Sequence, residues 1–345
     1  MCLFEYERNR GTGTLNAMSS RDEHGRVDEI LGPPYLAETI DFDEDEQGPI
    51  VTTLVQRRAA EPTTKAVLYV HGFNDYFFNK EYADWWVDRG YDFYAIDLRR
   101  YGRSLREWQT PNFVTDIREY FDDVDAAWGR IVDRDGHDHV VASAHSTGGL
   151  TLALWADEGA PHLEGVALNS PWLDMRGSIW LRTAGTAVVR QLGGRQPMRE
   201  IPREITTVYG ESLHRDYAGE WDYDLKLKTL ESWPVYAGWL RAIRNAHAEV
   251  HSGLDIACPV LVQSSGATID ARELNDDVHS HDIVLDVAQI RRWSTSLGRH
   301  VTYVGVDGAK HDIFLSRPAI RARAYDELGR WLTAYVEQGF TATGA

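Results

Sequence analysis

A turn of small residues places one serine where it could act as a nucleophile. Residues 142–149 read Ala-Ser-Ala-His-Ser-Thr-Gly-Gly, with Ser146 near the centre, an apolar pair before them at 140–141 and a helix-like run after them at 150–155. A serine on a tight turn between a strand and a helix has its hydroxyl pushed away from the backbone, and the unpaired N–H groups of the helix can bind an oxyanion. Ser146 is therefore a candidate nucleophile, with Ala144 in place of the first glycine of the G-x-S-x-G pattern.

A serine hydroxyl is a weak nucleophile unless a histidine accepts its proton and a carboxylate orients that histidine. The chain has 13 histidines. His311 is distinguished by its position, because the segment Gly308-Ala-Lys-His311-Asp-Ile-Phe lies between an expected strand at 300–306 and the last expected helix. His311 is therefore the candidate base, and the other histidines are expected to face solvent or to pack.

Several carboxylates after the expected strand at 259–263 can supply the acid. They share a long polar stretch and all satisfy the chain order Ser…Asp…His; they are Asp270, Asp276, Asp277, Asp282 and Asp286. Asp282 begins the segment Asp-Ile-Val-Leu-Asp-Val, which runs directly into the next expected helix. Chain order alone leaves the choice among them open.

Acyl transfer also needs two N–H donors that face the developing oxyanion. One is expected from the backbone of Thr147, directly after the candidate nucleophile. The other is expected from Phe73 in the loop His71-Gly72-Phe73-Asn74, which follows the expected strand at 66–70. Gly72 permits the tight bend that would turn the Phe73 N–H inward.

Alternating strands and helices must hold these residues in place. Apolar stretches of strand length recur at 35–42, 50–56, 66–70, 91–96, 139–143, 165–168, 259–263 and 300–306. After the first two, helix-like periodicity falls between them, at 80–89, 115–133, 147–158, 287–297 and from 319 to about 336. This alternation predicts an α/β protein with a mainly parallel sheet that is flanked by helices on both faces.

The alternation stops between 172 and 255, which we interpret as an inserted helical lid. This stretch holds five of the twelve tryptophans: Trp172, Trp180, Trp221, Trp233 and Trp239. Helices that pack on a sheet need large apolar residues, but so many aromatic side chains favour an apolar acyl pocket. We expect four residues to line that pocket: Asn74, His145, Trp172 and Trp239. The remaining chain is expected to form a core from 33–171 and 256–345, after a loose N-terminal segment at 1–32.

Composition argues against some classes of partner. The 345 residues carry a net charge of −17, and 43% of them are hydrophobic, enough for a sizeable core. The negative charge argues against nucleic acid and against anionic membrane surfaces. Two cysteines, Cys2 and Cys258, predict no disulfide and fit a reducing compartment. With no leader-like segment and no apolar run of membrane-spanning length, we expect a cytoplasmic protein without a membrane anchor.

Two further patterns predict no chemistry of their own. The His-x-His pairs His137/His139 and His279/His281 resemble metal ligands, but this spacing suits a strand and each pair lies in an expected loop or at its edge. The segment Tyr209-Gly-Glu-Ser212 resembles the serine turn, yet no apolar strand precedes it. We therefore expect neither a metal nor a cofactor, and the oligomeric state stays open.

Six segments, in order, make the chain similar to the α/β-hydrolases, specifically to the branch of monoglyceride lipases, lysophospholipases and serine aminopeptidases. They are His71-Gly-Phe, Asp97-Leu-Arg-Arg-Tyr-Gly-Arg-Ser104, the turn at Ser146, Asn169-Ser-Pro171, Asp282-Ile-Val-Leu-Asp and Gly308-Ala-Lys-His311-Asp. The chain departs from the family pattern at Ala144, at Arg100 and in the long stretch before Asp282. In this family the acid begins a segment just ahead of a helix, which implies Asp282. The apolar residues 283–285 can anchor that carboxylate, whereas Asp270 would lie on a longer tether.

The resemblance implies an α/β-hydrolase fold and a serine hydrolase. The expected substrate is a small carboxylic ester with an apolar acyl group, monoacyl or lysolipid-like, cleaved by Ser146, His311 and Asp282 through an acyl-enzyme. One alternative is a serine aminopeptidase, in which a lid carboxylate holds the substrate amine; Glu204, Glu211 and Glu220 are available. Another is a ligand-binding protein that uses the same fold without catalysis.

Overall fold

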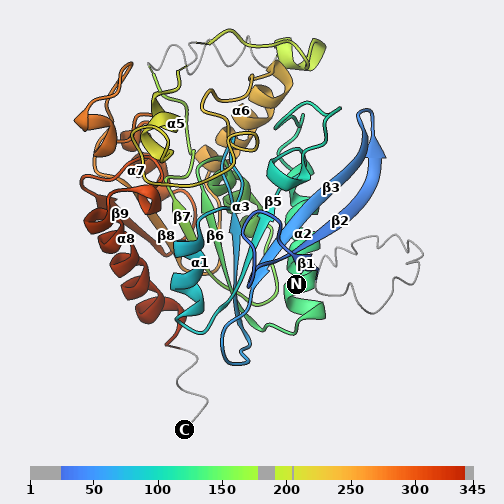
Figure 1. The fold of residues 1–345 in the computed structure, drawn as a ribbon, viewed down its shortest axis with the longest axis vertical. Coiled ribbons are helices and arrows are strands. Elements are labelled where there is room, and N and C mark those ends of the chain that lie inside the picture. Colours follow the sequence, from blue (N-terminus) through green and yellow to red (C-terminus); the bar gives the residue numbers. More distant parts are fainter. Residues whose placement is uncertain (1–24, 178–190, 204–205, 339–345) are drawn as a thin grey trace, which may run out of the picture.

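The structure, a computed structural model, describes residues 25–177, 191–203 and 206–338 (Figure 1). Cys2, Trp180 and Glu204, which the sequence singles out, lie outside these residues. In the described chain nine strands form one sheet in the order β1-β2-β3-β5-β4-β6-β7-β8-β9. The strands are β1 Arg26–Val27, β2 Leu36–Asp45, β3 Gly48–Arg57, β4 Lys65–Val70, β5 Asp92–Asp97, β6 His139–His145, β7 Leu163–Asn169, β8 Val260–Ser265 and β9 Val301–Val306. The strands from β5 to β9 along this order pair in parallel, and β1, β2 and β3 extend one edge in antiparallel fashion.

Helices cover both faces of this sheet. They are α1 Lys80–Val87, α2 Glu119–Gly129, α3 Thr147–Asp157, α5 Val208–Leu213, α6 Ala237–Ser252, α7 Val287–Ser294 and α8 Pro318–Trp331. Alternate strand residues point to opposite faces, so neighbours divide between two hydrophobic clusters: Val140 packs with α2, α3 and α6, whereas Val141 packs with α1 and α8. The expected α/β class with a mainly parallel sheet is confirmed.

The ordered core begins earlier than residue 33. Strand β1 pairs with β2, Leu31 is buried, and the buried carboxylate of Asp28 accepts a 2.7 Å contact from Nε of Arg103. Arg103 also pairs with Asp97 at 2.8 Å, so one guanidinium joins the start of the described chain to the end of β5. Short polar segments such as 25–32 show no periodicity, which is why the sequence places them in the loose N-terminal segment.

Helix α2 begins later than the expected residue 115. The carboxylate of Glu119 accepts hydrogen bonds from the N–H groups of Thr115 at 2.8 Å and Asp116 at 3.0 Å, so these residues form a turn ahead of the helix. The helix ends at Gly129 and passes into a π-helical turn, η2 Arg130–Arg134.

The described parts of 172–255 contain helical residues 191–195, α5, α6 and long connections, and α5 lies above the carboxyl ends of the strands in Figure 1. Helix α6 differs from the rest, because its buried residues Ile243, Ala246 and Val250 join the same hydrophobic cluster as α3. This helix is therefore packed into the core layer, and the part of the stretch that stands above the sheet is the chain before it.

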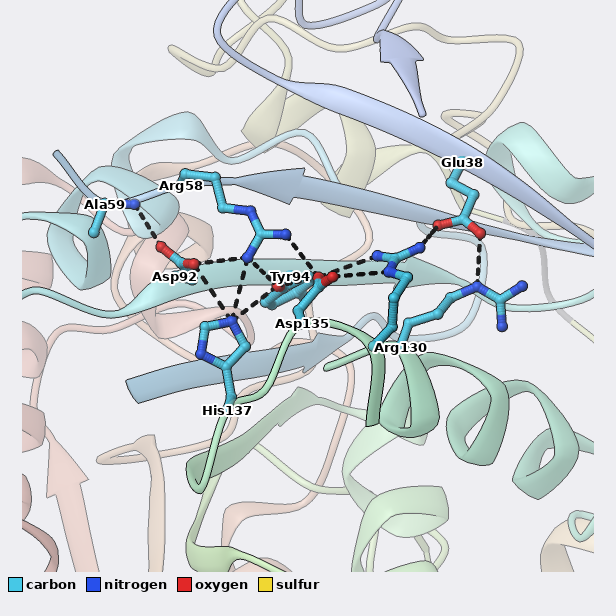
Figure 2. Close-up of polar contacts among 9 residues, drawn as sticks. Glu38, Arg58, Ala59, Asp92, Tyr94, Arg130, Asp135 and His137 are labelled. Carbon is cyan, nitrogen blue, oxygen red and sulfur yellow. Dashed lines mark hydrogen bonds and ion pairs between the residues drawn. The ribbon is translucent and has the colours of Figure 1, made fainter. Parts of the chain in front are cut away.

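Ion pairs fasten the amino ends of the central strands (Figure 2). Arg58, just after β3, contacts Asp92 at 2.8 Å and Asp135 at 2.7 Å. Nε2 of His137 lies 3.0 Å from the Tyr94 hydroxyl and 3.4 Å from Asp92. Asp92 is the first residue of β5, so this cluster lies at the opposite end of the parallel strands from the turn that follows β6. His137, from the first His-x-His pair, therefore belongs to a network that joins β3, β5 and the chain before β6.

Candidate active site

Ser146 occupies a strained turn between β6 and α3. Its backbone has φ 52° and ψ −117°, outside the common regions for a residue with a side chain. Close packing enforces the turn, because a Cβ at Gly148 would lie 2.2 Å from the carbonyl oxygen of His71, and a Cβ at Gly149 would lie 2.8 Å from Cβ of Pro171. Ala144 is fully buried in β6, so its methyl group is accommodated where the pattern has glycine.

The structure brings Ser146, His311 and Asp282 together in one hydrogen-bonded chain. Nδ1–H of His311 donates to Oδ2 of Asp282 at 2.8 Å, and the Ser146 hydroxyl donates to Nε2 of His311 at 3.0 Å. Ser146 follows β6, Asp282 precedes α7 and His311 follows β9. This is the arrangement in which a histidine can take the serine proton while a carboxylate holds the ring in the correct tautomer.

The Asp282 carboxylate is held by its own loop. Oδ1 accepts hydrogen bonds from the N–H groups of Val284 and Leu285, each at 2.8 Å, which leaves Oδ2 for the histidine. Asp270 lies elsewhere, with a side chain that is 94% exposed and paired with Arg176 at 2.6 Å. Of the two carboxylates compared in the sequence, the structure places Asp282 against His311.

Phe73 and Thr147 are the two residues whose N–H groups are expected to face an oxyanion. Both line the cavity above Ser146. A Cβ at Gly72 would lie 3.0 Å from Cβ of Ser146, so the loop 71–74 runs directly over the nucleophile. His71 fixes this loop from below. Its Nδ1–H donates to the Gly72 carbonyl at 2.8 Å while Nε2 accepts from the Leu98 N–H at 3.1 Å, and burial lowers the pKa of its ring.

Asn169 connects the serine turn to the histidine loop, a role that its residue type alone does not reveal. Its carbonyl accepts the Ser146 N–H at 3.0 Å, and its side-chain amide donates to Asp312 at 2.7 Å. Asp312 is buried, which raises the pKa of its carboxyl group. One residue at the end of β7 thus fixes the loops that carry the serine and the histidine relative to each other.

His145 lies between these groups. Its ring centroid is 4.7 Å from that of His311, and its Nδ1 is 3.7 Å from Oδ2 of Asp312. Burial holds the pKa of His145 well below its ordinary value, so the ring is neutral and places no second positive charge beside His311.

A cavity of about 310 Å³ opens above Ser146. All four residues expected in the pocket line it: Asn74, His145, Trp172 and Trp239. Trp239 packs on Phe73 with ring centroids 4.6 Å apart and on Trp172 at 5.8 Å. Trp221 and Trp233 do not line it; the indole N–H of Trp221 donates to the Leu315 carbonyl at 2.9 Å. Two of the four described lid tryptophans therefore face the cavity.

Part of the cavity lining carries charges that the sequence does not single out. Lys228 and Asp75 line the cavity and form a buried ion pair at 2.7 Å. Neither residue belongs to a recognisable motif, and they are 153 positions apart, so only the fold brings them together. Of the lid glutamates in the described chain, Glu211 accepts a hydrogen bond from Thr207 and Glu220 pairs with Arg321, and neither lines the cavity.

The fold and the side chains around Ser146 together define an α/β-hydrolase. A comparison with protein-family models matches residues 61–267 to the family described as serine aminopeptidase, S33. This match spans more than half of the chain, which therefore belongs to that family. A comparison with curated proteins gives no match.

Solved structures with the same fold include lipases and esterases. A monoglyceride lipase from Saccharomyces cerevisiae, in complex with a substrate analogue, superposes with a TM-score of 0.62 at 14% identity, covering 92% of this chain and 98% of that one. A monoacylglycerol lipase from Paleococcus ferrophilus gives 0.58 at 18%, covering 86% and 98%. A carboxyl esterase from Bacillus coagulans, in complex with glycerol, gives 0.61 at 13%, covering 87% and 99%. At these identities the likeness is one of fold.

Two features of the described residues concern membranes and metals. Among the helices of this part of the chain, none combines the length and the apolar character needed to cross a bilayer. Among the same residues, no three His, Cys, Asp or Glu side chains gather in a way that could hold a metal ion.

Proposed function

We propose that the protein is a serine hydrolase that cleaves carboxylic esters through an acyl-enzyme. The observation that carries this proposal is the hydrogen-bonded chain from Asp282 through His311 to Ser146, which ends at a largely apolar cavity. The non-catalytic alternative does not account for this chain, because a binding protein has no need of a strained serine aligned with a histidine and a buried carboxylate.

The reaction follows from these positions. Oγ of Ser146 attacks the ester carbonyl while its proton passes to Nε2 of His311, and the N–H groups of Phe73 and Thr147 stabilise the oxyanion. When the intermediate collapses, the bond to the alcohol breaks and His311 returns the proton to the leaving oxygen. Water then attacks the acyl-enzyme by the same route and releases the acid. Asp282 holds the imidazole tautomer and stabilises the imidazolium in both steps.

The charges in the cavity favour an ester over a peptide with a free amino terminus. An aminopeptidase must hold the substrate ammonium with a carboxylate that is not already neutralised. In the described residues Asp75 is the one acidic side chain that lines the cavity, and Lys228 pairs with it. This supports ester hydrolysis and leaves the aminopeptidase as the second candidate.

The apolar wall supports an apolar acyl group. Phe73, Trp172, Trp239 and Leu285 line the cavity, and hydrocarbon buried against such a wall gains about 25 cal/mol for each Å² removed from water. A single acyl chain fits a cavity of about 310 Å³ better than a multiply acylated lipid. The proposed substrates are therefore monoacyl or lysolipid-like esters, with the chain before α6 acting as the lid.

The test is a substrate panel with the purified protein. p-Nitrophenyl esters of increasing acyl length are compared with aminoacyl anilides, and a fluorophosphonate probe is applied to the wild type and to Ser146→Ala. We expect turnover of the esters, labelling of the wild type and neither in the variant. Labelling that persists at another serine overturns the assignment of the nucleophile, preferred turnover of the anilides supports the aminopeptidase, and no turnover or labelling of the wild type supports a binding protein.

The expected location belongs to the same proposal. The low cysteine count supports a reducing compartment, and we propose that the protein acts in the cytoplasm. Fractionation of cells that express the full chain, followed by probe labelling of each fraction, tests this.

A further inference from the structure

A buried ion pair joins the lid to the loop that carries Phe73. Nζ of Lys228 lies 2.7 Å from Oδ1 of Asp75, and the two residues are 6% and 4% exposed. Asp75 follows Phe73 by two positions, and its Oδ1 also accepts the Tyr76 N–H at 2.9 Å. The carboxylate is therefore fixed to its own backbone on one side and to the lid on the other.

A second link lies directly beside this ion pair. The side-chain amide of Asn74 donates to the Thr229 carbonyl at 2.9 Å, and the Thr229 hydroxyl donates back to the Asn74 side chain at 3.0 Å. Asn74 has φ 53°, a left-handed conformation that costs free energy, and its N–H is held by Asn112 at 3.0 Å. The backbone directly after Phe73 is thus strained, and it is held by contacts from two other parts of the chain.

The same lid segment is hydrogen-bonded, at its other end, to the loop that carries His311. The Tyr209 hydroxyl accepts the Asp312 N–H at 3.2 Å, and Trp221 donates to the Leu315 carbonyl at 2.9 Å. Residues 206–229 therefore span the cavity from the loop of His311 to the loop of Phe73. We call this segment the strap.

We propose that Lys228 is a positioning residue for the oxyanion hole, acting through Asp75 to fix the Phe73 N–H over Ser146. This role deepens the proposed function and rests on it. An oxyanion donor is effective only when its direction is fixed before the reaction, and a misplacement of about 1 Å costs large factors in rate. The ion pair and the Asn74–Thr229 hydrogen bonds give the strap two fixed points on the loop that must supply this donor.

The matched variants separate positioning from simple stabilisation. Lys228→Met leaves a buried carboxylate without a partner, which by itself destabilises the fold. Asp75→Asn combined with Lys228→Met removes both charges, so it restores stability without restoring the link. Lys228→Arg keeps the charge. Lys226→Met makes the same substitution at an exposed position two residues away and serves as the control.

Turnover of a short ester and inhibition by a boronic acid, whose adduct occupies the oxyanion hole, are measured for each variant. We expect Lys228→Met to lower kcat by about 10- to 100-fold with KM changed less than about threefold, and to weaken boronate inhibition by a similar factor. We expect the double variant to regain the wild-type Tm but to stay slow, and Lys228→Arg to recover most of the rate. The control should match the wild type.

Other outcomes overturn the role. A Lys228→Met kcat within about twofold of the wild type, or a double variant that regains both Tm and kcat, leaves the pair with stability alone. A raised KM with an unchanged kcat makes Lys228 a substrate contact. If Lys228→Met does not fold, Thr229→Val removes the hydroxyl that donates to Asn74 and also contacts the Glu231 carbonyl, and an unchanged kcat there is equally contradictory. A wild type that turns over no ester overturns the proposed function itself, which these variant comparisons distinguish from failure of the positioning role.

Discussion

Oδ2 of Asp282 lies 2.8 Å from Nδ1 of His311. This contact forms because the long loop that leaves the end of β8 returns to that end before it reaches Asp282. Thr268 and Asp282 form a parallel bridge, the Asp282 N–H donates to the Ala267 carbonyl at 3.0 Å, and the Ile269 N–H donates to the Asp282 carbonyl at 3.1 Å. The residues between these contacts form an excursion whose two ends are tied together. Its length therefore does not alter the position of the acid, which depends on the tied ends.

Asp282→Asn should lower turnover by roughly 10³- to 10⁴-fold, because an amide at this position favours the wrong tautomer of His311. Asp270→Asn is the matched control, since its exposed side chain pairs with Arg176 on the surface. We expect that control to stay within about twofold of the wild type. Steady-state kinetics on one ester give both numbers. A severe Asp270 variant beside a mild Asp282 variant would reverse the assignment of the acid.

Gly148→Ala should destabilise the fold and abolish activity together. The added Cβ would lie 2.2 Å from the His71 carbonyl oxygen, a backbone atom of the loop beside the nucleophile, which cannot move aside like the end of a flexible side chain. We expect a loss of more than about 2 kcal/mol in the free energy of unfolding, measured by urea titration. Gly129→Ala at the end of α2 is the control. The nearest atom to its added Cβ is 3.6 Å away, so it should be neutral or slightly stabilising. An unperturbed Gly148 variant would mean that the serine turn tolerates expansion.

The sequence predicts the parts of this molecule whose position follows from chain order. Ser146, His311 and Phe73 each lie on a loop directly after a parallel strand, and the carboxyl ends of parallel strands meet at one edge of the sheet. The alternation of strand-like and helix-like stretches, with small residues in the turns between them, therefore locates these residues without a structure. The ends of the elements are less well placed, since features such as the Glu119 carboxylate, which captures two N–H groups ahead of α2, leave no hydrophobic pattern.

The charged part of the cavity lining could not be predicted in this way. Lys228 and Asp75 are ordinary residues in the sequence, and their pairing depends on how the strap crosses the cavity. The lid tryptophans show the same limit, because aromatic content indicates an apolar region but not which rings face it. Trp239 lines the cavity from a helix packed into the core, whereas Trp221 anchors the strap away from it.

Trp239→Phe should change the preferred acyl length. Trp239 is buried, lines the cavity and packs on Phe73, so a smaller ring makes room for a longer or bulkier acyl chain. We expect the optimum in kcat/KM across a series of p-nitrophenyl esters to move to longer chains. Trp221→Phe removes an indole of the same size outside the cavity and should leave the profile unchanged. Identical profiles for the two variants would place the acyl group elsewhere.

Lys310→Met should stabilise the protein most at neutral pH. Lys310 is 3% exposed, and burial lowers the pKa of its ammonium group to about 8 from 10.5. Because the unfolded chain holds its proton more tightly, it binds more protons than the folded chain between about pH 8 and 10.5, so wild-type stability contributed by this group rises with pH across that window. Below about pH 8 the buried charge costs up to about 3 kcal/mol, which methionine removes while keeping an apolar stem of similar size.

The difference in unfolding free energy between Lys310→Met and the wild type should therefore be largest near pH 7 and narrow steadily as the pH rises from 8 towards 10.5. Urea titrations at several pH values measure it, and Lys226→Met, at an exposed position, corrects for the loss of one surface charge. The contact of Nζ with the Ser212 carbonyl reduces the gain at every pH without changing the slope, because a neutral amine also donates. A gap that stays constant from pH 7 to 10 would mean that Lys310 titrates alike in the folded and unfolded chains, which would require water to reach its ammonium group beside His311.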